Sequence, residues 1–255
     1  ICTNIYMIIS YKFCGRLGNN ISQLANIISI AIAYKHNIKF RHGHKFFDLS
    51  VIEKYFSKYN NSEIITDKEN FFRRKTLPFP YDIFKQNIEE RNKILQKAFL
   101  IDNIKKLPEN DLVIHIRSGD LFNRDMSTKR KPHPGYVPPP LSYYTKEIDK
   151  YEYKKIHIIC EDTKNPVVNE LLKLYKNAVY EQNTLEKDIR IILGATNIIY
   201  SVGTFITSLM LLSNNKKYLH PSALSNGKLK EYFKIMKPWK NTIEQRNYIL
   251  TYDYN

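Results

Sequence analysis

Blocks of apolar and polar positions alternate along this chain and predict strands and helices in turn. A β-rich run, Met7–Phe13, precedes a glycine-containing turn and then Ile21–His36, where apolar residues recur at helical spacing. Later, the short apolar run Leu112–Ile114 predicts a buried parallel strand. The other predicted strands are Ile38–Phe40, Lys155–Cys160, Asn177–Tyr180 and Asn197–Ser201; the other predicted helices are Val51–Tyr59, Ile83–Phe99, Tyr143–Tyr151, Lys164–Tyr175, Asp188–Ala195, Phe205–Leu212 and a last one in Tyr232–Asn255. Strands that alternate with helices are typical of α/β proteins with parallel sheets.

This order predicts two α/β halves that face each other across a cleft. We expect an amino-terminal domain in residues 1–108, a carboxyl-terminal domain in 109–230 and a helical tail in 231–255, with a junction at Leu107–Asn110. The basic, proline-rich segment Leu121–Pro140 cannot pack a core. It is interpreted either as a functional lid or as a solvated insertion.

The formal net charge of +15 favours polyanions or a phosphate-bearing ligand as partners. Abundant Ile, Asn, Lys and Tyr also fit a codon bias, so part of this charge needs no function. A nucleic-acid-binding protein is one alternative, but the basic residues are dispersed and no recognition-helix or aromatic-strand signature accompanies them. The three cysteines, Cys2, Cys14 and Cys160, are odd in number and widely spaced, which favours a reducing compartment over a disulfide framework or a zinc site.

The most apolar stretches, Leu24–Tyr34 and Ile198–Leu212, are too short to span a bilayer. No signal peptide is predicted, and Met7-Ile8-Ile9 has the character of an opening strand although the chain begins with Ile1. The expected location is therefore cytoplasmic, as for a bacterial or viral protein. A Golgi location would require a membrane anchor outside this sequence.

Polar residues follow three of the predicted strands. His115, Arg117 and Asp120 come after the strand at Leu112–Ile114; Glu161 with Asp162 and Ser201 with Thr204 follow two others. Ligands of open α/β sheets bind at the carboxyl ends of the strands, so these residues together predict a nucleotide site. A serine or threonine alone at such a place is more often a helix cap.

The turn at Gly15-Arg16-Leu17-Gly18-Asn19-Asn20 lies between the first strand and the first helix. Glycines allow close backbone approach, and a helix start offers amide donors to an anion. The spacing matches neither the dinucleotide fingerprint nor a Walker loop. The glycines are therefore interpreted either as ligand-facing or as turn-forming. A sugar-nucleotide oxidoreductase is disfavoured, because the three-glycine fingerprint and a suitable Tyr-x-x-x-Lys pair are both missing.

Three motifs, in order, resemble the α1,2-fucosyltransferases, a glycosyltransferase family 11-like group within the superfamily of α1,2-, α1,6- and protein O-fucosyltransferases. They are the Gly15–Asn20 turn, His115-Ile116-Arg117-Ser118-Gly119-Asp120, and Asp188 followed by Asn197-Ile198-Ile199-Tyr200-Ser201 with Thr204-Phe205. The resemblance extends over nearly the whole chain. It implies a GT-B fold of two Rossmann-like domains and inverting transfer of L-fucose from GDP-β-L-fucose to a glycan hydroxyl in α1,2 linkage. No metal or other cofactor is expected, and the absence of an Asp-x-Asp motif agrees with that.

The resemblance also implies roles for individual residues. Arg117 matches the arginine that binds the donor pyrophosphate, and a guanidinium can hold two phosphate oxygens through parallel hydrogen bonds. His115 is expected to contact the nucleotide or to orient its loop, and Asp188 matches a carboxylate that recognises guanine. The implied donor-binding set is Gly15, Arg16, Gly18, His115, Arg117, Glu161, Asp162, Asp188, Ser201, Thr204 and Phe205.

Inversion needs a base, or a group that orients the acceptor, on the face opposite GDP. Asp125 matches a carboxylate with this role in α1,6 relatives. Asp120 is the alternative, although it could instead fix the Arg117 loop by accepting backbone amides. Asn19 matches an asparagine near the reacting centre of the O-fucosyltransferases. The implied catalytic residues are therefore Arg117, Asp125, Asp120 and Asn19.

Two departures from the family pattern affect the predicted donor. Ser118 replaces a second arginine, and Phe205-Ile206-Thr207-Ser208 replaces the usual F-S-W-W-G-A segment. The first departure weakens the grip on phosphate or frees space for another donor. GDP-mannose, GDP-rhamnose and other deoxysugar donors are therefore alternatives, as are a protein O-fucosyltransferase-like enzyme and an inactive, divergent member.

Overall fold

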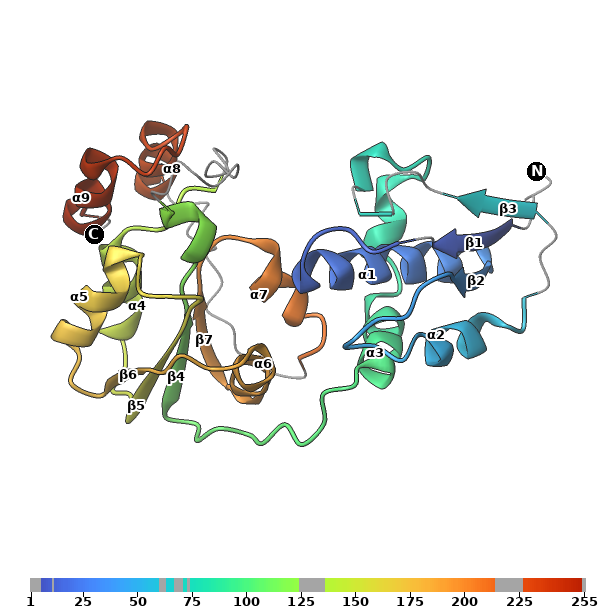
Figure 1. Ribbon diagram of the computed structural model, residues 1–255, viewed down its shortest axis with the longest axis horizontal. Helices are drawn as coiled ribbons and strands as arrows, with labels where there is room; N and C mark the ends of the chain where they lie inside the picture. The colour runs from blue at the N-terminus through green and yellow to red at the C-terminus, as the bar shows by residue number, and fades with distance from the viewer. Residues whose placement is uncertain are drawn as a thin grey trace. The chain divides into compact units, whose positions relative to one another are not determined.

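The computed structural model describes residues 6–10, 12–59, 63–66, 71–72, 74–123, 136–213 and 227–253. The chain divides into two compact units (Figure 1). Unit 1 comprises Ile1–Asn103 and Thr204–Ser213; unit 2 comprises Ile104–Gly203 and Asn214–Asn255. Thr204–Ser213 thus packs with the amino-terminal unit, although the sequence places it late in the chain.

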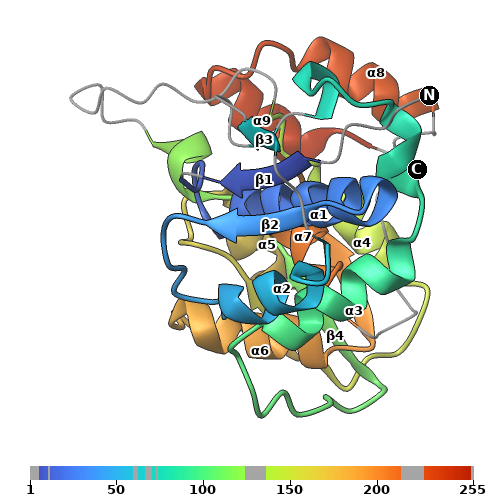
Figure 2. The ribbon, with the colours of Figure 1, turned by 90° about the vertical axis from the view of Figure 1, so that its right-hand side faces the viewer.

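Unit 1 is built on a three-stranded parallel sheet. The central strand β1 (Tyr6–Ser10) pairs with β2 (Asn37–Phe40) on one side and with β3 (Glu63–Thr66) on the other. Helix α1 (Leu17–Tyr34) runs alongside β1 and β2 (Figure 2). It is buried over most of its circumference, as expected of a helix that is apolar on several faces. The helix begins four residues before the predicted start at Ile21, because the polar motif Gly18–Asn20 is itself helical.

Short helices complete unit 1. They are α2 (Leu49–Phe56), η1 (Arg74–Thr76), η2 (Tyr81–Lys85), α3 (Ile88–Ala98) and α7 (Thr204–Leu209). The single helix predicted over Ile83–Phe99 is wrong, since η2 and α3 are separated there by Asn87, whose φ of 51° interrupts helical geometry. Strand β3 was not predicted from the sequence, because it is short and lies within a charged, aromatic stretch.

Unit 2 contains a four-stranded parallel sheet with the order β6-β5-β4-β7. Its strands are β4 (Asp111–His115), β5 (Lys155–Ile159), β6 (Ala178–Tyr180) and β7 (Asn197–Tyr200), and all four were predicted. The helices α4 (Leu141–Ile148), α5 (Pro166–Leu174) and α6 (Leu185–Gly194) alternate with them. The chain progresses outward from β4 to β6 and then returns, so that β7 pairs with β4 from the other side. The order therefore reverses between β4 and β7, which is where open α/β sheets bind ligands.

The carboxyl-terminal segment of unit 2 forms two helices, α8 (Gly227–Ile235) and α9 (Ile243–Thr251). The prediction of one helix in this tail is wrong because Pro238, which has no backbone N–H, lies between them, and Thr242 caps a new helix start. Trp239 between the helices is buried in the core around β4 and β5. In the part of the chain that the structure describes, no helix has the length and apolar character needed to cross a bilayer.

The short 3-10 helix η3 (Gly119–Phe122) follows β4 and is held by this carboxyl-terminal segment. Trp239 Nε1 donates to the Leu121 carbonyl at 2.8 Å, and Arg246 Nη2 donates to the Phe122 carbonyl at 2.9 Å. These bonds satisfy carbonyls that a helix end leaves without partners.

Candidate functional site

Arg117 lies two residues beyond the end of β4, in unit 2, and is held by two carboxylates. Its Nη1 donates to Glu161 Oε1 and its Nη2 donates to Asp120 Oδ1, both at 2.5 Å. The side chain is 19% exposed. A guanidinium carries five N–H donors, so these contacts leave three of them without a hydrogen bond to any described residue. Arg117 is thus fixed in place and still able to bind an oxyanion.

The two carboxylates change the electrostatics of this site. Asp120, predicted as a base or as an acceptor of backbone amides, accepts a hydrogen bond from the Arg117 guanidinium, and its predicted roles stay predictions. Glu161, predicted to contact the donor, likewise binds Arg117. The three side chains together carry a formal charge of −1. An incoming phosphate must therefore share Arg117 with these carboxylates or replace one of them, and Asp120 and Glu161 each have 37% of their side chain exposed.

Ser118 faces the interior rather than the open edge of the sheet. It is fully buried, and its Oγ donates to Asp162 Oδ1 at 2.5 Å. The alternative donors expected from the loss of a second arginine stay predictions. Burial favours a higher pKa for Asp162, but hydrogen bonds from Ser118 and from the backbone amides of Lys164 and Gly119 lower the pKa below its ordinary value. Asp162 thus fixes the loop after β4 and has its Oδ1 occupied internally.

His115 and Ser201 both lie inside unit 2. Burial, and next the positive charge of Arg117, lower the pKa of His115 to about 3, so its imidazole is neutral at pH 7. Ser201 is buried as well, and its amide donates to the His115 carbonyl at 3.0 Å. Between the two roles predicted for His115, this burial favours orientation of the loop over nucleotide contact. Ser201 extends the β4–β7 pairing.

Asp188 lies in the first turn of α6, half-buried. Burial raises the pKa of its carboxyl, against an opposing hydrogen bond from Asn183 Nδ2 at 3.0 Å. Its charge reaches Cys160, which directly follows β5: burial, and then the charges of Asp162, Asp188 and Glu161, raise the pKa of that thiol to about 12. The acidic residues predicted for the donor site therefore lie along one edge of the unit 2 sheet.

The motif residues of unit 1 are used for helix packing. A Cβ on Gly18 would lie 2.5 Å from the backbone of Phe205, so the glycine allows α7 to approach α1. Thr204 Oγ1 donates to Asn19 Oδ1 at 2.6 Å across the same contact. Gly15, in contrast, has a φ of 70° and forms the turn before α1. A ligand-facing role for Gly18 stays a prediction, and Asn19, Thr204 and Phe205 are brought together as neighbours. Arg16 precedes α1 and is exposed.

Two carboxamides that the motif prediction did not single out hold the loop after β1. Asn20 Nδ2 donates to the Cys14 carbonyl at 2.9 Å, and Gln23 Nε2 donates to the Lys12 carbonyl at 2.8 Å. Asn20 Oδ1 also pairs with Nε2 of His44, whose Nδ1 accepts the Phe46 amide. Both ring nitrogens are thereby engaged in a neutral tautomer, which disfavours His44 as a base.

Asn165 is a third residue that sequence reasoning missed. The pair Asn165-Pro166 is a recognisable helix start, since asparagine caps helices and proline suits the first helical position. The sequence offers no signal for its second contact, in which Nδ2 donates to the Arg117 carbonyl at 2.9 Å.

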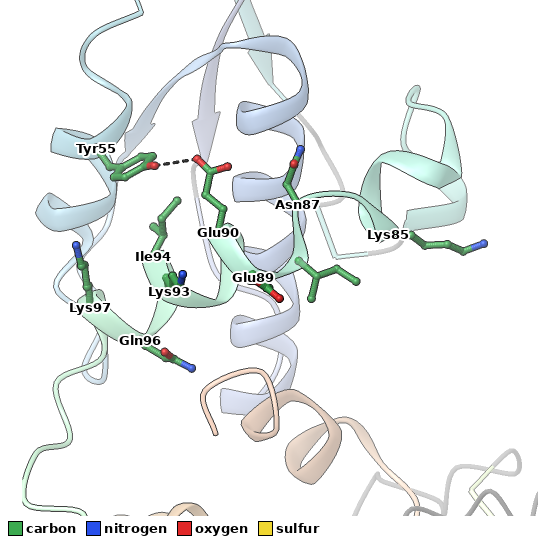
Figure 3. Close-up of a pocket in the computed structure, with 10 residues that line it drawn as sticks. Tyr55, Lys85, Asn87, Glu89, Glu90, Lys93, Ile94, Gln96 and Lys97 are labelled. Carbon is green, nitrogen blue, oxygen red and sulfur yellow. Dashed lines mark hydrogen bonds between the residues drawn. The ribbon is translucent and has the colours of Figure 1, made fainter. Parts of the chain in front are cut away.

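A hollow of about 850 Å³ lies on unit 1 against α2, η2 and α3 (Figure 3). Tyr55 at its border donates its hydroxyl to Glu90 at 2.8 Å, and Lys85, Lys93 and Lys97 also line it. None of the predicted site residues lines this hollow, and we assign no chemistry to it.

Asp125 lies outside the described residues, and so does Cys2. Within the described ranges, no group of three or more His, Cys, Asp or Glu side chains is arranged to hold a metal ion. A metal-free reaction and the identity of the base stay predictions.

No family model matches this sequence, and no curated protein matches it. Solved structures of fucosyltransferases are similar to this chain at a low level. A structure of POFUT1 in complex with GDP-fucose is 12% identical, with a TM-score of 0.45 over 86% of this chain and 98% of that chain. A structure of NodZ α-1,6-fucosyltransferase soaked with GDP-fucose is 10% identical, with a TM-score of 0.38 over 82% and 93%. A structure of fucosyltransferase NodZ from Bradyrhizobium is also 10% identical, with a TM-score of 0.39 over the same shares. Similarity at this level assigns neither a fold family nor an activity to this chain.

Proposed function

We propose that this chain is a glycosyltransferase that binds a GDP-sugar at the carboxyl edge of the unit 2 sheet and transfers L-fucose from GDP-β-L-fucose to a glycan hydroxyl. The observation that carries the proposal is the Arg117 guanidinium, fixed by Asp120 and Glu161 and left with three N–H donors beside the reversal of strand order. The three sequence motifs supply the identity of the donor. In this proposal the two units are the two Rossmann-like domains of a GT-B enzyme.

The proposed reaction breaks the bond between the sugar C1 and the β-phosphate oxygen, and the acceptor oxygen forms the new bond to C1. GDP leaves with the electron pair of the broken bond, so negative charge grows on its phosphates. Arg117 would stabilise this charge through charge-assisted hydrogen bonds without requiring a metal. The acceptor proton passes to a base, for which Asp125 is proposed, because Asp120 is already engaged by Arg117. Transfer with inversion and an α1,2 linkage belong to the proposal.

Gly203 supports ligand access next to Arg117. The residue has a φ of 114°, and a Cβ placed on it would lie 3.8 Å from Arg117 Cδ. The turn after β7 therefore follows the flank of the arginine side chain closely. A diphosphate bound to Arg117 would lie near the backbone of this turn, which suits the binding of phosphate by main-chain amides.

Calorimetric titration with GDP, GDP-fucose, GDP-mannose, inorganic pyrophosphate and UDP-glucose tests the proposal. The guanosine compounds and pyrophosphate are expected to bind the wild-type protein, and Arg117→Ala is expected to lose this binding. Lys173→Ala is the matched control, because it removes a cation paired with Glu170 in the last turn of α5 and is expected to leave binding unchanged. Binding of UDP-glucose without GDP compounds would refute the proposal, and so would binding of random oligonucleotides alone. Hydrolysis of each GDP-sugar then separates fucose from mannose and other donors.

A further inference from the structure

Asn165 connects the start of α5 with the backbone of Arg117. The side chain is fully buried, and its Oδ1 accepts the Val167 amide at 3.1 Å, which caps the helix. Its Nδ2 donates to the Arg117 carbonyl at 2.9 Å. One carboxamide therefore makes a bond to a helix end with its oxygen and a bond to the arginine's backbone with its nitrogen.

The neighbouring residue Ser118 strengthens this connection. The backbone N–H of Asn165 donates to Ser118 Oγ at 3.0 Å, and the same hydroxyl donates to Asp162. Gly119 follows with a φ of 58°, and a Cβ there would lie 2.6 Å from Glu161. Residues 117 and 118 are thus bound to the β5–α5 connection at consecutive positions, next to a residue whose conformation glycine tolerates best.

We infer that Asn165 is a positioning residue, whose amide nitrogen holds the Arg117 backbone so that the guanidinium faces the diphosphate of the donor. The inference rests on the proposed function for its ligand. Its physical basis is burial: a hydrogen bond broken in the interior leaves the Arg117 carbonyl without its partner, at a cost of about 1–3 kcal/mol. The loop relieves that cost by moving, and small displacements of a catalytic group have large effects on rate.

Helix capping alone is the competing role, and other caps allow the two to be separated. Asp48 caps α2 in unit 1 by accepting the Ser50 amide at 3.1 Å, and its carboxylate also accepts from the Ser50 hydroxyl. Both hydrogen bonds that its carboxylate accepts lie within that helix start. A substitution that removes the Asp48 cap therefore shows how the loss of a helix cap alone affects ligand binding, because Asp48 makes no hydrogen bond to Arg117.

Asn165→Ser is the test variant, because serine keeps the ability to cap α5 and is too short to reach the Arg117 carbonyl. Titration of the full chain with GDP and with pyrophosphate is expected to show an unchanged stoichiometry and a dissociation constant raised about tenfold. Asp48→Ala is expected to leave the dissociation constant unchanged. Ser118→Ala removes the hydrogen bond between the Asn165 amide and Ser118 Oγ and leaves the Asn165 side-chain cap in place. It is also expected to raise the dissociation constant. A reduced stoichiometry with an unchanged dissociation constant would show a merely structural role and overturn the inference.

The position of Arg117 can also be followed without any nucleotide. Phenylglyoxal modifies arginine side chains, and peptide mass spectrometry gives the rate at Arg117 alone. This rate is expected to rise in Asn165→Ser and to stay at the wild-type value in Asp48→Ala. An unchanged rate in Asn165→Ser refutes the positioning role. If the rate rises although the wild-type protein binds no diphosphate, the proposed function fails and the positioning role survives.

Discussion

The carboxyl edges of the two parallel sheets are built from different chemistry. After β1, in unit 1, neutral carboxamides bind backbone groups: Asn20 binds the Cys14 carbonyl and Gln23 binds the Lys12 carbonyl. After β4, in unit 2, a cation lies between two carboxylates, Asp120 and Glu161. Both loops are well bonded, the loop after β1 by these neutral carboxamides and the loop after β4 by charged groups.

This difference suggests two roles for a strand–loop–helix unit. The unit at β1 stabilises the fold, and the unit at β4 is proposed to bind a ligand. A neutral network is satisfied by the protein itself, and its helix is free to pack closely, as α1 does against α7 through Gly18. A charged network retains a field beyond its own contacts and can exchange one anionic partner for another. This difference is the reason that the proposed phosphate site lies after β4.

The largest expected effect follows from Arg117→Lys. Lysine keeps the charge but lacks the planar fork that contacts Asp120, Glu161 and a phosphate together. Turnover of the GDP-sugar is expected to fall by about 10²–10³-fold, as for loss of one preorganised donor. Steady-state kinetics measure it, with Lys173→Ala as the control. Turnover within a few-fold of wild type would contradict the proposed chemical role of the charged loop after β4.

Gly18→Ala tests the packing role of unit 1. The added methyl group would overlap the Phe205 backbone, so the free energy of unfolding is expected to fall by about 1–3 kcal/mol. Gly43→Ala is the matched control, because no atom lies within 4 Å of its added Cβ, and its effect is expected to stay within about 0.5 kcal/mol. Urea unfolding followed by circular dichroism gives both values. Equal stability of the two variants would contradict close packing at Gly18.

Burial is the first cause of a lowered pKa for His36 in unit 1, to about 4, and for His115 in unit 2, to about 3. Below pH 6.5 the unfolded chain binds a proton that the folded chain does not. The stabilisation is therefore complete above pH 6.5 and declines as the pH falls toward the folded pKa, by about 1.4 kcal/mol per pH unit for each histidine.

Urea unfolding at pH 7, 6 and 5 measures this slope. His36→Gln is expected to flatten it for unit 1, and His115→Gln for unit 2. A slope that neither substitution changes would show that other groups control the pH dependence.

The smallest expected effect concerns the competition for Arg117. Glu161→Gln removes a negative charge that a diphosphate has to displace, so binding of pyrophosphate is expected to tighten by up to about fivefold, as for an exposed ion pair of at most about 1 kcal/mol. Calorimetry measures the change. Glu170→Gln serves as the control, because it removes the carboxylate that pairs with Lys173 and leaves the Arg117 contacts unchanged. Weaker binding in Glu161→Gln would mean that Glu161 supports the ligand instead of competing with it.

Local patterns predicted the parts of this molecule that depend on neighbours in sequence. The apolar run Leu112–Ile114 predicted β4. It also predicted that Arg117 lies just beyond the end of this strand, because a buried strand and its polar end are adjacent in the chain. The role of Gly18 could not be predicted, since the helix packed against it begins at Thr204. The Asn165 contact with Arg117 joins residues 48 apart in sequence and depends on β5 pairing with β4. The single helix predicted in the tail is wrong because Pro238 lies between α8 and α9.

Trp239 is the only tryptophan of the chain. Its ring centroid lies 5.4 Å from that of Phe122, and its indole N–H bonds Leu121, so it contacts both closing residues of η3. Asp120 in the same short helix holds Arg117. Indole emission from this protein therefore arises from a single position coupled to the arginine loop. Movement of that loop when an anion binds would register as a change in intrinsic fluorescence, without any label.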